Sequence, residues 1–106
     1  MADLEQIFAA MGDNFDASKA AGVNLSVQFD LSGDGGGQYY AKVADGKLDA
    51  NKGAVDNPDA TLKMDAGDFA AMSKGDLNPM MAFMSGKIKV DGDLNTVMKF
   101  QQVVGL

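Results

Sequence analysis

Three short stretches of this chain contain residue types that could support chemistry or ion binding. The first, residues 30–35 (DLSGDG), matches the first half of an EF-hand calcium loop. Such a loop also needs a bidentate Glu at its twelfth position, where this chain has Ala41. The flanking residues alternate as strands do, so we interpret the segment as a hairpin turn and expect no metal ion.

The second stretch, residues 33–37 (GDGGG), superficially resembles a phosphate-binding loop. A dinucleotide or phosphate loop must lead into a helix whose N-terminus holds the anion. Here a strand pattern follows, and no Lys-Ser or Lys-Thr pair completes a P-loop. We therefore interpret the glycines as a flexible turn and expect no cofactor.

The third candidate is a set of side chains, Asp30, Tyr39 and Tyr40, from which proton transfer on a steroid could be built. Strand alternation directs Asp30 and Tyr40 to one face and Tyr39 to the other, so no pair is evidently buried together. The chain also lacks His, Cys, Arg and Trp, which removes most acid–base and nucleophilic groups. We expect a protein without enzymatic activity and keep an isomerase-like enzyme as a weaker alternative.

Composition narrows the remaining function classes. The 106 residues carry a net charge of −6, and this length suffices for one hydrophobic core, so we predict a single domain over residues 1–106. The nine Lys are scattered along the chain. They do not form the basic cluster that phosphate binding requires, so we expect no nucleic-acid partner.

No segment predicts membrane insertion or export. No apolar run approaches the ~20 residues that span a bilayer, and the acidic residues 1–5 lack the cationic start of a signal peptide. The absence of Cys is compatible with a reducing compartment. We expect a cytoplasmic protein without stable membrane insertion.

Hydrophobic periodicity predicts a helix at each end of the chain, with strands and helices between. Asp45-Gly46, between the second and third strands, is typical of a type I′ hairpin turn. The predicted helices cover residues 4–11, 15–21, 66–74, 79–85 and 94–104, and the predicted strands cover residues 23–31, 37–43, 47–51, 60–65 and 87–91. A crossover over residues 53–59 joins the third and fourth strands.

This order of elements predicts an α+β fold. The strands have one polar and one apolar face, and the helices are amphipathic, so we expect a single mixed five-stranded sheet covered by helices on one face. Apart from the short helical stretch at 15–21, the order is helix, three strands, crossover, strand, two helices, strand and helix.

Methionine is concentrated in the second half of the chain, where six of the eight Met lie between Met64 and Met98. Apolar residues at helical spacing usually face a core. Met also conforms to ligands of varied shape, and residues 79–84 (PMMAFM) make nearly every side of a short helix apolar. The pattern alone leaves core filling and a ligand cavity as equal alternatives.

Six short segments form one recognisable set, most of it after residue 75. They are residues 27–30 (VQFD), 59–62 (DATL), 75–79 (GDLNP), 82–90 (AFMSGKIKV), 92–94 (GDL) and 98–101 (MKFQ). Together they resemble the sterol carrier protein 2 (SCP2) family, whose members are small lipid carriers with a hydrophobic tunnel. The resemblance covers nearly the whole chain and implies the same order of elements as the periodicity.

The resemblance implies non-catalytic binding and transfer of a lipid or other apolar ligand, such as a fatty acid, a fatty acyl derivative or a sterol-like molecule. The tunnel would lie between the sheet and the C-terminal helices, and Gln101 could offer an amide to a head group at its mouth. The candidate ligand-binding residues are Val27, Phe29, Leu62, Phe69, Met72, Met80, Phe83, Met84, Val97, Met98, Phe100 and Gln101.

One alternative function uses the same apolar groove. A partner helix or a second copy of this chain would also bury such a surface. We therefore keep a protein-interaction or dimerisation module as the second hypothesis, and expect a monomer or a weak homodimer.

Overall fold

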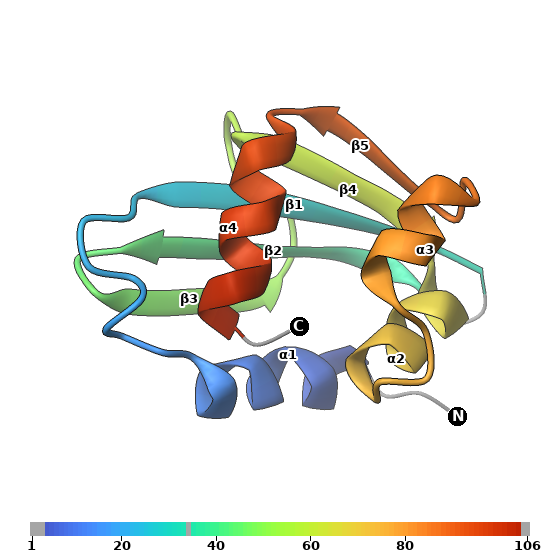
Figure 1. Cartoon of the computed structure of the whole chain (residues 1–106), viewed down its shortest axis with the longest axis horizontal. Helices are drawn as coiled ribbons and strands as arrows, with labels where there is room; N and C mark the ends of the chain where they lie inside the picture. The colour runs from blue at the N-terminus through green and yellow to red at the C-terminus, as the bar shows by residue number, and fades with distance from the viewer. Residues whose placement is uncertain (1–3, 34, 105–106) are drawn as a thin grey trace.

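A computed structural model describes residues 4–33 and 35–104, which form four helices and five strands (Figure 1). The elements in chain order are α1 (Leu4–Asn14), β1 (Leu25–Ser32), β2 (Gly37–Ala44), β3 (Lys47–Lys52), β4 (Ala60–Asp65), α2 (Ala66–Ser73), α3 (Pro79–Met84), β5 (Ile88–Gly92) and α4 (Leu94–Val104). None of these helices is long and apolar enough to cross a membrane.

The strands form one mixed sheet in the order β3-β2-β1-β4-β5. The central pair, β1 and β4, is parallel, and the other three pairs are antiparallel. Since β3 and β4 are not neighbours, residues 53–59 must cross β2 and β1 to connect them. This confirms the predicted α+β fold with a mixed five-stranded sheet and a crossover between the third and fourth strands.

Local signals in the sequence define several element boundaries. Asp45 and Gly46 both have positive φ, at 55° and 72°, as a type I′ hairpin turn requires. The carboxylate of Asp65 accepts hydrogen bonds from the backbone N–H groups of Gly67 and Asp68 and so caps α2. Asn78 caps α3 in the same way.

Two predictions near the N-terminus are wrong, namely the end of the first helix and the helix at residues 15–21. Helix α1 continues through Gly12 to Asn14, because one Gly inside a helix costs only about 1 kcal/mol and does not end it. Where a helix was predicted at residues 15–21, the chain instead forms a series of turns. One of their hydrogen bonds is donated by the N–H of Ala20 to the backbone oxygen of Asp16 at 3.2 Å. The polar side chains of this segment hydrogen-bond locally instead, since both N–H and O–H of Ser18 donate to the Asp16 carboxylate.

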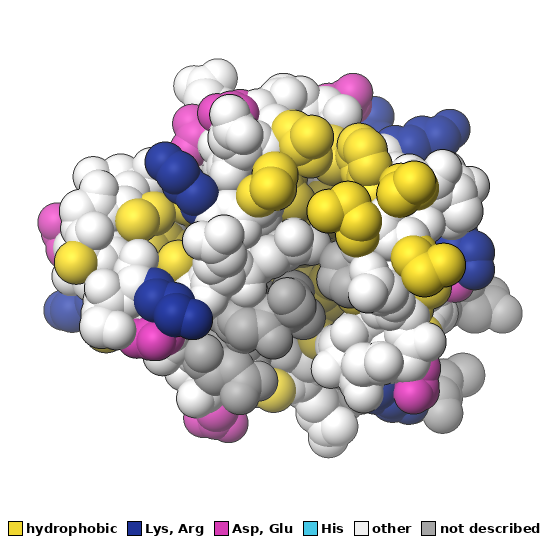
Figure 2. All heavy atoms as spheres, in the orientation of Figure 1, with side chains coloured by type: hydrophobic (Ala, Val, Ile, Leu, Met, Phe, Trp, Pro, Cys, Tyr) yellow, Lys and Arg dark blue, Asp and Glu magenta, His cyan; other side chains and the backbone are white. Residues whose placement is uncertain are grey.

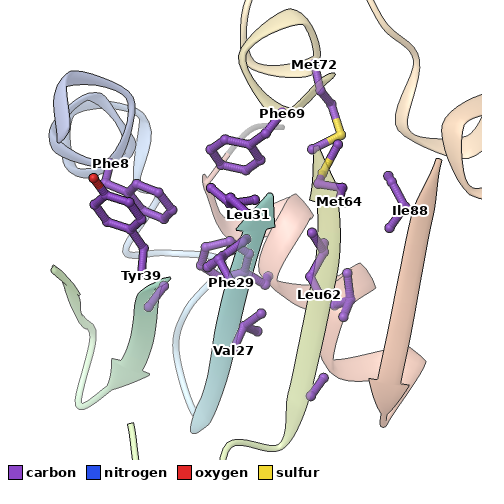
Figure 3. Close-up of a cluster of buried hydrophobic side chains, with 14 of the residues drawn as sticks. Phe8, Val27, Phe29, Leu31, Tyr39, Leu62, Met64, Phe69, Met72 and Ile88 are labelled. Carbon is purple, nitrogen blue, oxygen red and sulfur yellow. The ribbon is translucent and has the colours of Figure 1, made fainter. Parts of the chain in front are cut away.

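The apolar face of the sheet packs against the helices through an aromatic cluster (Figure 3). At its centre, Phe29 of β1 lies 5.1 Å from Phe8 of α1, measured between ring centroids. It lies 5.6 Å from both Phe69 of α2 and Phe100 of α4. Phe8 also stacks on Tyr39 of β2 at 4.6 Å. Three helices are therefore joined to the same face of the sheet.

The crossover lies on the opposite face, where Gln28 anchors it. This side chain is buried, and its Nε2 donates to the backbone oxygens of Tyr39 at 3.0 Å and Gly53 at 3.1 Å. Its Oε1 accepts from the N–H of Val55 at 2.9 Å. Both polar atoms of the Gln28 amide are therefore hydrogen-bonded, and these bonds hold the crossover against the central strand β1.

The Gln28 contacts yield a stability prediction. Replacing Gln28 with Leu leaves Gly53 O and Val55 N without a side-chain partner, so we expect the free energy of unfolding to fall by about 3 kcal/mol in a urea titration. Gln38→Leu is the matched control, because Gln38 is exposed on β2 and should change stability by less than ~0.5 kcal/mol. Equal effects of the two substitutions would contradict the anchoring role.

Candidate functional site

A cavity of about 350 Å³ lies between α3, α4 and the β4–β5 side of the sheet. This volume is within the range of small-molecule sites, which starts near ~300 Å³. The residues that line it are Leu62, Asn78, Met80, Phe83, Ile88, Val90, Leu94, Val97, Met98 and Gln101.

The floor of the cavity consists of the inward-facing residues of two strands. Leu62 of β4 lies opposite Val90 of β5, and Ile88 follows on the same face of β5. Strand alternation turns the intervening Lys89 to the other face, which keeps its charge out of the floor. The floor is therefore entirely aliphatic.

Helix α4 supplies the second wall. The lining residues Leu94, Val97, Met98 and Gln101 follow the i, i+3, i+4, i+7 spacing that places side chains on one helix face. Asp93 directly precedes the helix, and its carboxylate accepts from the N–H of Asn95 at 2.9 Å. This cap places the first turn of α4 over the end of β5.

The turn between β5 and α4 depends on a glycine. Gly92 has φ of +94°, and a Cβ at this position would lie 2.6 Å from the backbone oxygen of Asp59. The same oxygen accepts the N–H of Asp93 at 3.0 Å. The direction in which α4 leaves the sheet is thus set by close backbone contact with the end of the crossover.

Helix α3 forms the third wall and has few buried side chains. Ala82 is fully buried and holds the helix to the molecule, whereas the lining residues Met80 and Phe83 are 61% and 41% exposed. Figure 2 shows hydrophobic side chains gathered around the region between α3 and the first turns of α4. Since several lining residues are also exposed, the cavity opens to solvent on this side.

The polar groups at the cavity are two amides. The Oδ1 of Asn78 accepts from the N–H groups of Met80 and Met81, which leaves its NH₂ group available to a ligand. The side-chain amide of Gln101 makes no hydrogen bond within the described part of the chain. Among the described residues, no ionisable side chain lines the cavity. The site can therefore bind apolar surface and offer neutral hydrogen-bonding groups, but it offers no counter-ion for a charged head group.

The nearest ion pair lies away from the cavity lining. Lys63 Nζ is 2.8 Å from the Asp91 carboxylate, between β4 and β5. The hydrogen bond and the charge of Asp91 raise the pKa of Lys63 above its ordinary value. Both groups are solvent-exposed, so the pair neutralises charge at the sheet edge and contributes little to stability.

The structure brings together six of the twelve candidate residues and places the others elsewhere. The six that line the cavity are Leu62, Met80, Phe83, Val97, Met98 and Gln101. Five others, namely Val27, Phe29, Phe69, Met72 and Phe100, are buried in the hydrophobic core. Met84 is 78% exposed and does not line the cavity.

Four lining residues were not among the candidates. Ile88, Val90 and Leu94 carried a signal, because each belongs to the apolar face of its predicted strand or helix. Asn78 directly precedes the helix predicted at residues 79–85, and as its cap it lies beside the helix that it begins. Its place in the lining follows from where α3 lies, which the local pattern does not specify.

The other candidate motifs do not converge on a site. Ala41, at the twelfth position of the calcium-loop pattern, is buried within β2. Asp34 lies outside the described residues. Asp30 is exposed, whereas Tyr39 is buried against Phe8, and neither lines the apolar cavity. Among the described residues no group of three or more acidic side chains is arranged to hold a metal ion.

Comparison with known families identifies the chain. Residues 4–105 match the SCP-2 sterol transfer family, and the chain belongs to this family. It is 32% identical over 103 residues to hydroxysteroid dehydrogenase-like protein 2 of Xenopus laevis, covering 96% of this chain and 25% of the relative. The match to the Mus musculus protein of the same name is 31% and covers 21% of that relative. The chain thus spans about a quarter of these curated relatives or less.

Solved structures show the same fold. Palmitated SCP2L2 from Aedes aegypti superposes with a TM-score of 0.75 at 26% identity, covering 97% of this chain and 91% of that one. Apo sterol carrier protein 2 from Yarrowia lipolytica gives 0.70 at 25%, covering 93% and 84%. The sec-alkylsulfatase Pisa1 from Pseudomonas gives 0.84 at 19% identity, covering 96% of this chain and 16% of that one, and this likeness concerns the fold alone.

The cap of α3 yields a prediction about the cavity wall. Asn78→Ala removes the acceptor of two backbone N–H groups, so we expect a loss of about 1 kcal/mol in unfolding free energy and faster amide hydrogen exchange in α3. Asn95→Ala is the control, since the exposed Asn95 lies inside α4 and Ala is the better helix former. A change in exchange that is no larger in α3 than elsewhere would contradict this role.

Proposed function

We propose that the cavity between α3, α4 and the β4–β5 side of the sheet binds an acyl chain or another apolar lipid group, and that the protein carries this ligand without chemical change. The observation that carries the proposal is the lining itself, which combines aliphatic and methionine side chains with two neutral amides. Burial of each ligand methylene there contributes ~0.8 kcal/mol.

The size of the cavity suggests the length of the buried segment. One methylene occupies about 30 Å³, as a water molecule does in the liquid. The cavity of about 350 Å³ therefore has room for about a dozen methylenes. A longer chain or a sterol would extend through the opening or displace α3. Helix α3 is suited to such displacement because most of its large side chains are already exposed.

The relatives support this ligand class. The family is named for sterol transfer, and the Aedes aegypti structure is that of palmitated SCP2L2. The relatives named for dehydrogenase or sulfatase activity match through a quarter of their length or less. We infer that this chain corresponds to a lipid-binding domain over residues 1–106 and that catalysis in those proteins belongs to their other parts.

We therefore centre the proposed ligand contacts on the lining residues. Met80 and Phe83 on α3, with Met98 on α4, would adapt to chains of different shape because they are large and partly exposed. The buried aromatic residues Phe29 and Phe100 would support the site from below rather than touch the ligand.

A matched pair of substitutions tests the location of the site. Met98→Lys places an ammonium at the lining, and we expect it to weaken binding of a fluorescent fatty acid by about tenfold, since desolvating a charge is unfavourable. Met81→Lys makes the same change on α3 at a side chain that does not line the cavity, and should leave affinity within about twofold. Equal losses would place the ligand elsewhere, and circular dichroism checks that both variants fold.

The neutral lining gives a prediction about the head group. We expect dodecanol to bind more tightly than dodecanoate at pH 7, because no cation from the described residues lines the cavity to offset desolvation of the carboxylate. Dodecanoate should bind more tightly as the pH falls through the ligand's own carboxyl pKa, and dodecanol should show no such change. Isothermal titration calorimetry measures both, and tighter binding of the carboxylate at pH 7 would contradict the neutral-site interpretation.

The first experiment on the unmodified protein is native mass spectrometry followed by organic extraction. A co-purified apolar molecule in a defined ratio would support the carrier function and identify the ligand class. A protein that is empty and also fails to take up dodecanol or a fluorescent fatty acid would overturn it, and would favour an interaction module.

A further inference from the structure

Strand β5 forms one edge of the sheet, and its outer side has no neighbouring strand in the described part of the chain. The other edge strand, β3, packs against α1 (Figure 1). A bare edge presents backbone N–H and C=O groups to which another strand can hydrogen-bond. Charged side chains often protect such an edge, so the order of charges along β5 decides whether a second strand can pair with it.

The hydrogen bonds between β4 and β5 determine which backbone groups face the open edge. The N–H of Asp93 donates to the oxygen of Asp59 at 3.0 Å, and this bond flanks the pair of Ala60 and Gly92. That pair is therefore of the non-hydrogen-bonded kind, which alternates with hydrogen-bonded pairs along an antiparallel ladder. Val90, two residues before Gly92, belongs to the same kind of pair. Its N–H and C=O thus point away from β4, to the open edge.

The charges along this edge change sign at Val90. Residues 87–93 read KIKVDGD, with two lysines before Val90 and two aspartates after it. If two copies of β5 pair antiparallel about Val90, Lys89 of each copy lies opposite Asp91 of the other. These two residues then form a non-hydrogen-bonded pair, in which side chains lie closest together. Moving the centre of symmetry to Lys89 or to Asp91 would place like charges opposite each other, so the charges favour one register.

A single copy leaves Lys89 without an acidic partner. Lys89 lies directly opposite Lys63 of β4, and the Asp91 carboxylate is 2.8 Å from Lys63 Nζ. Among the described residues no ion pair includes Lys89. A second copy would bring its own Asp91 beside Lys89, which would offset the repulsion between the two lysines.

The same pairing covers apolar side chains on the other face of the sheet. Helix α3 ends shortly before β5, and α4 begins shortly after it. The antiparallel arrangement therefore places α3 of one copy beside the first turn of α4 of the other. Met84 of α3 and Leu94 of α4 are both exposed, and they belong to the hydrophobic cluster between these helices (Figure 2). A soluble protein rarely exposes such a cluster without a binding role.

We propose that a second copy of this chain binds the outer edge of β5, antiparallel and two-fold symmetric about Val90, so that the two sheets become one. Val90 exchanges backbone hydrogen bonds with its counterpart, Lys89 pairs with Asp91 on the polar face, and Met84 packs toward Leu94 on the apolar face. Charge complementarity selects this partner, because the charge order of β5 is complementary to itself in this register. The dimer needs no ligand and does not depend on the carrier function.

Charge reversal tests the pairing in sedimentation velocity runs over a range of protein concentrations. We expect the wild type to dimerise as its concentration rises. Lys89→Asp and Asp91→Lys should each raise the dimer dissociation constant by about tenfold, because two attractive cross-strand pairs become repulsive. An equal mixture of these two variants should dimerise again, since each charge then lies opposite its complement. This recovery also shows that both variants fold.

The chain offers a matched control and a local readout. Lys42→Asp makes the same charge reversal at an exposed residue of β2, away from the β5 edge, and should dimerise as the wild type does. The amide N–H of Val90 should exchange slowly with solvent only at concentrations that give dimer, because it faces the open edge. The N–H of Lys89 faces β4 and should exchange slowly at every concentration.

Three results would overturn the proposal. The wild type could remain a monomer up to ~1 mM, the mixed variants could fail to recover the dimer, or Val90 could exchange equally fast in the monomer and the dimer. Dodecanol titration separates this proposal from the ligand proposal. A monomer that binds dodecanol would contradict the dimer alone, whereas a β5-paired dimer that does not bind it would contradict the ligand proposal alone.

Discussion

The contacts of Phe29 at the centre of the sheet determine how the rest of this molecule is arranged. Its ring meets Phe8, Phe69 and Phe100, and these come from α1, α2 and α4. Aromatic residues bury more apolar surface than other side chains, so a cluster of this size fixes each helix that contributes to it. Helix α3 contributes no ring to this cluster. Its buried contact with the rest of the molecule is made by the small side chain of Ala82.

The cavity forms where this cluster ends. Between α3 and α4, the sheet presents Leu62, Ile88 and Val90, and no aromatic side chain from the core fills the space above them. A protein interior is normally packed without voids of this size. The aromatic cluster and the cavity are therefore adjacent on the same face of the sheet. Helix α4 contributes to both, because Phe100 packs in the cluster while Met98 lines the cavity.

Much of the fold was predictable from local patterns. The turn predicted at Asp45 and Gly46 depends on neighbouring residues alone, and it was confirmed. The caps that Asp65 and Asn78 form are local interactions of the same kind. The helix predicted at residues 15–21 failed because Asp16 and Ser18 form local hydrogen bonds that compete with helix. For the candidate site, the residues on α3, α4 and β4 included six that line the cavity, and five of the others are core residues.

The sequence by itself determined most of the order of the elements, the apolar face of each and the absence of His, Cys, Arg and Trp. These properties depend on residue type and on the periods of strand and helix. Only the tertiary structure decided which apolar side chains meet the core and which meet the cavity. The period places Phe100 and Met98, two residues apart, at opposite edges of the apolar stripe of α4, but the neighbour that each one meets depends on how the helix crosses the sheet.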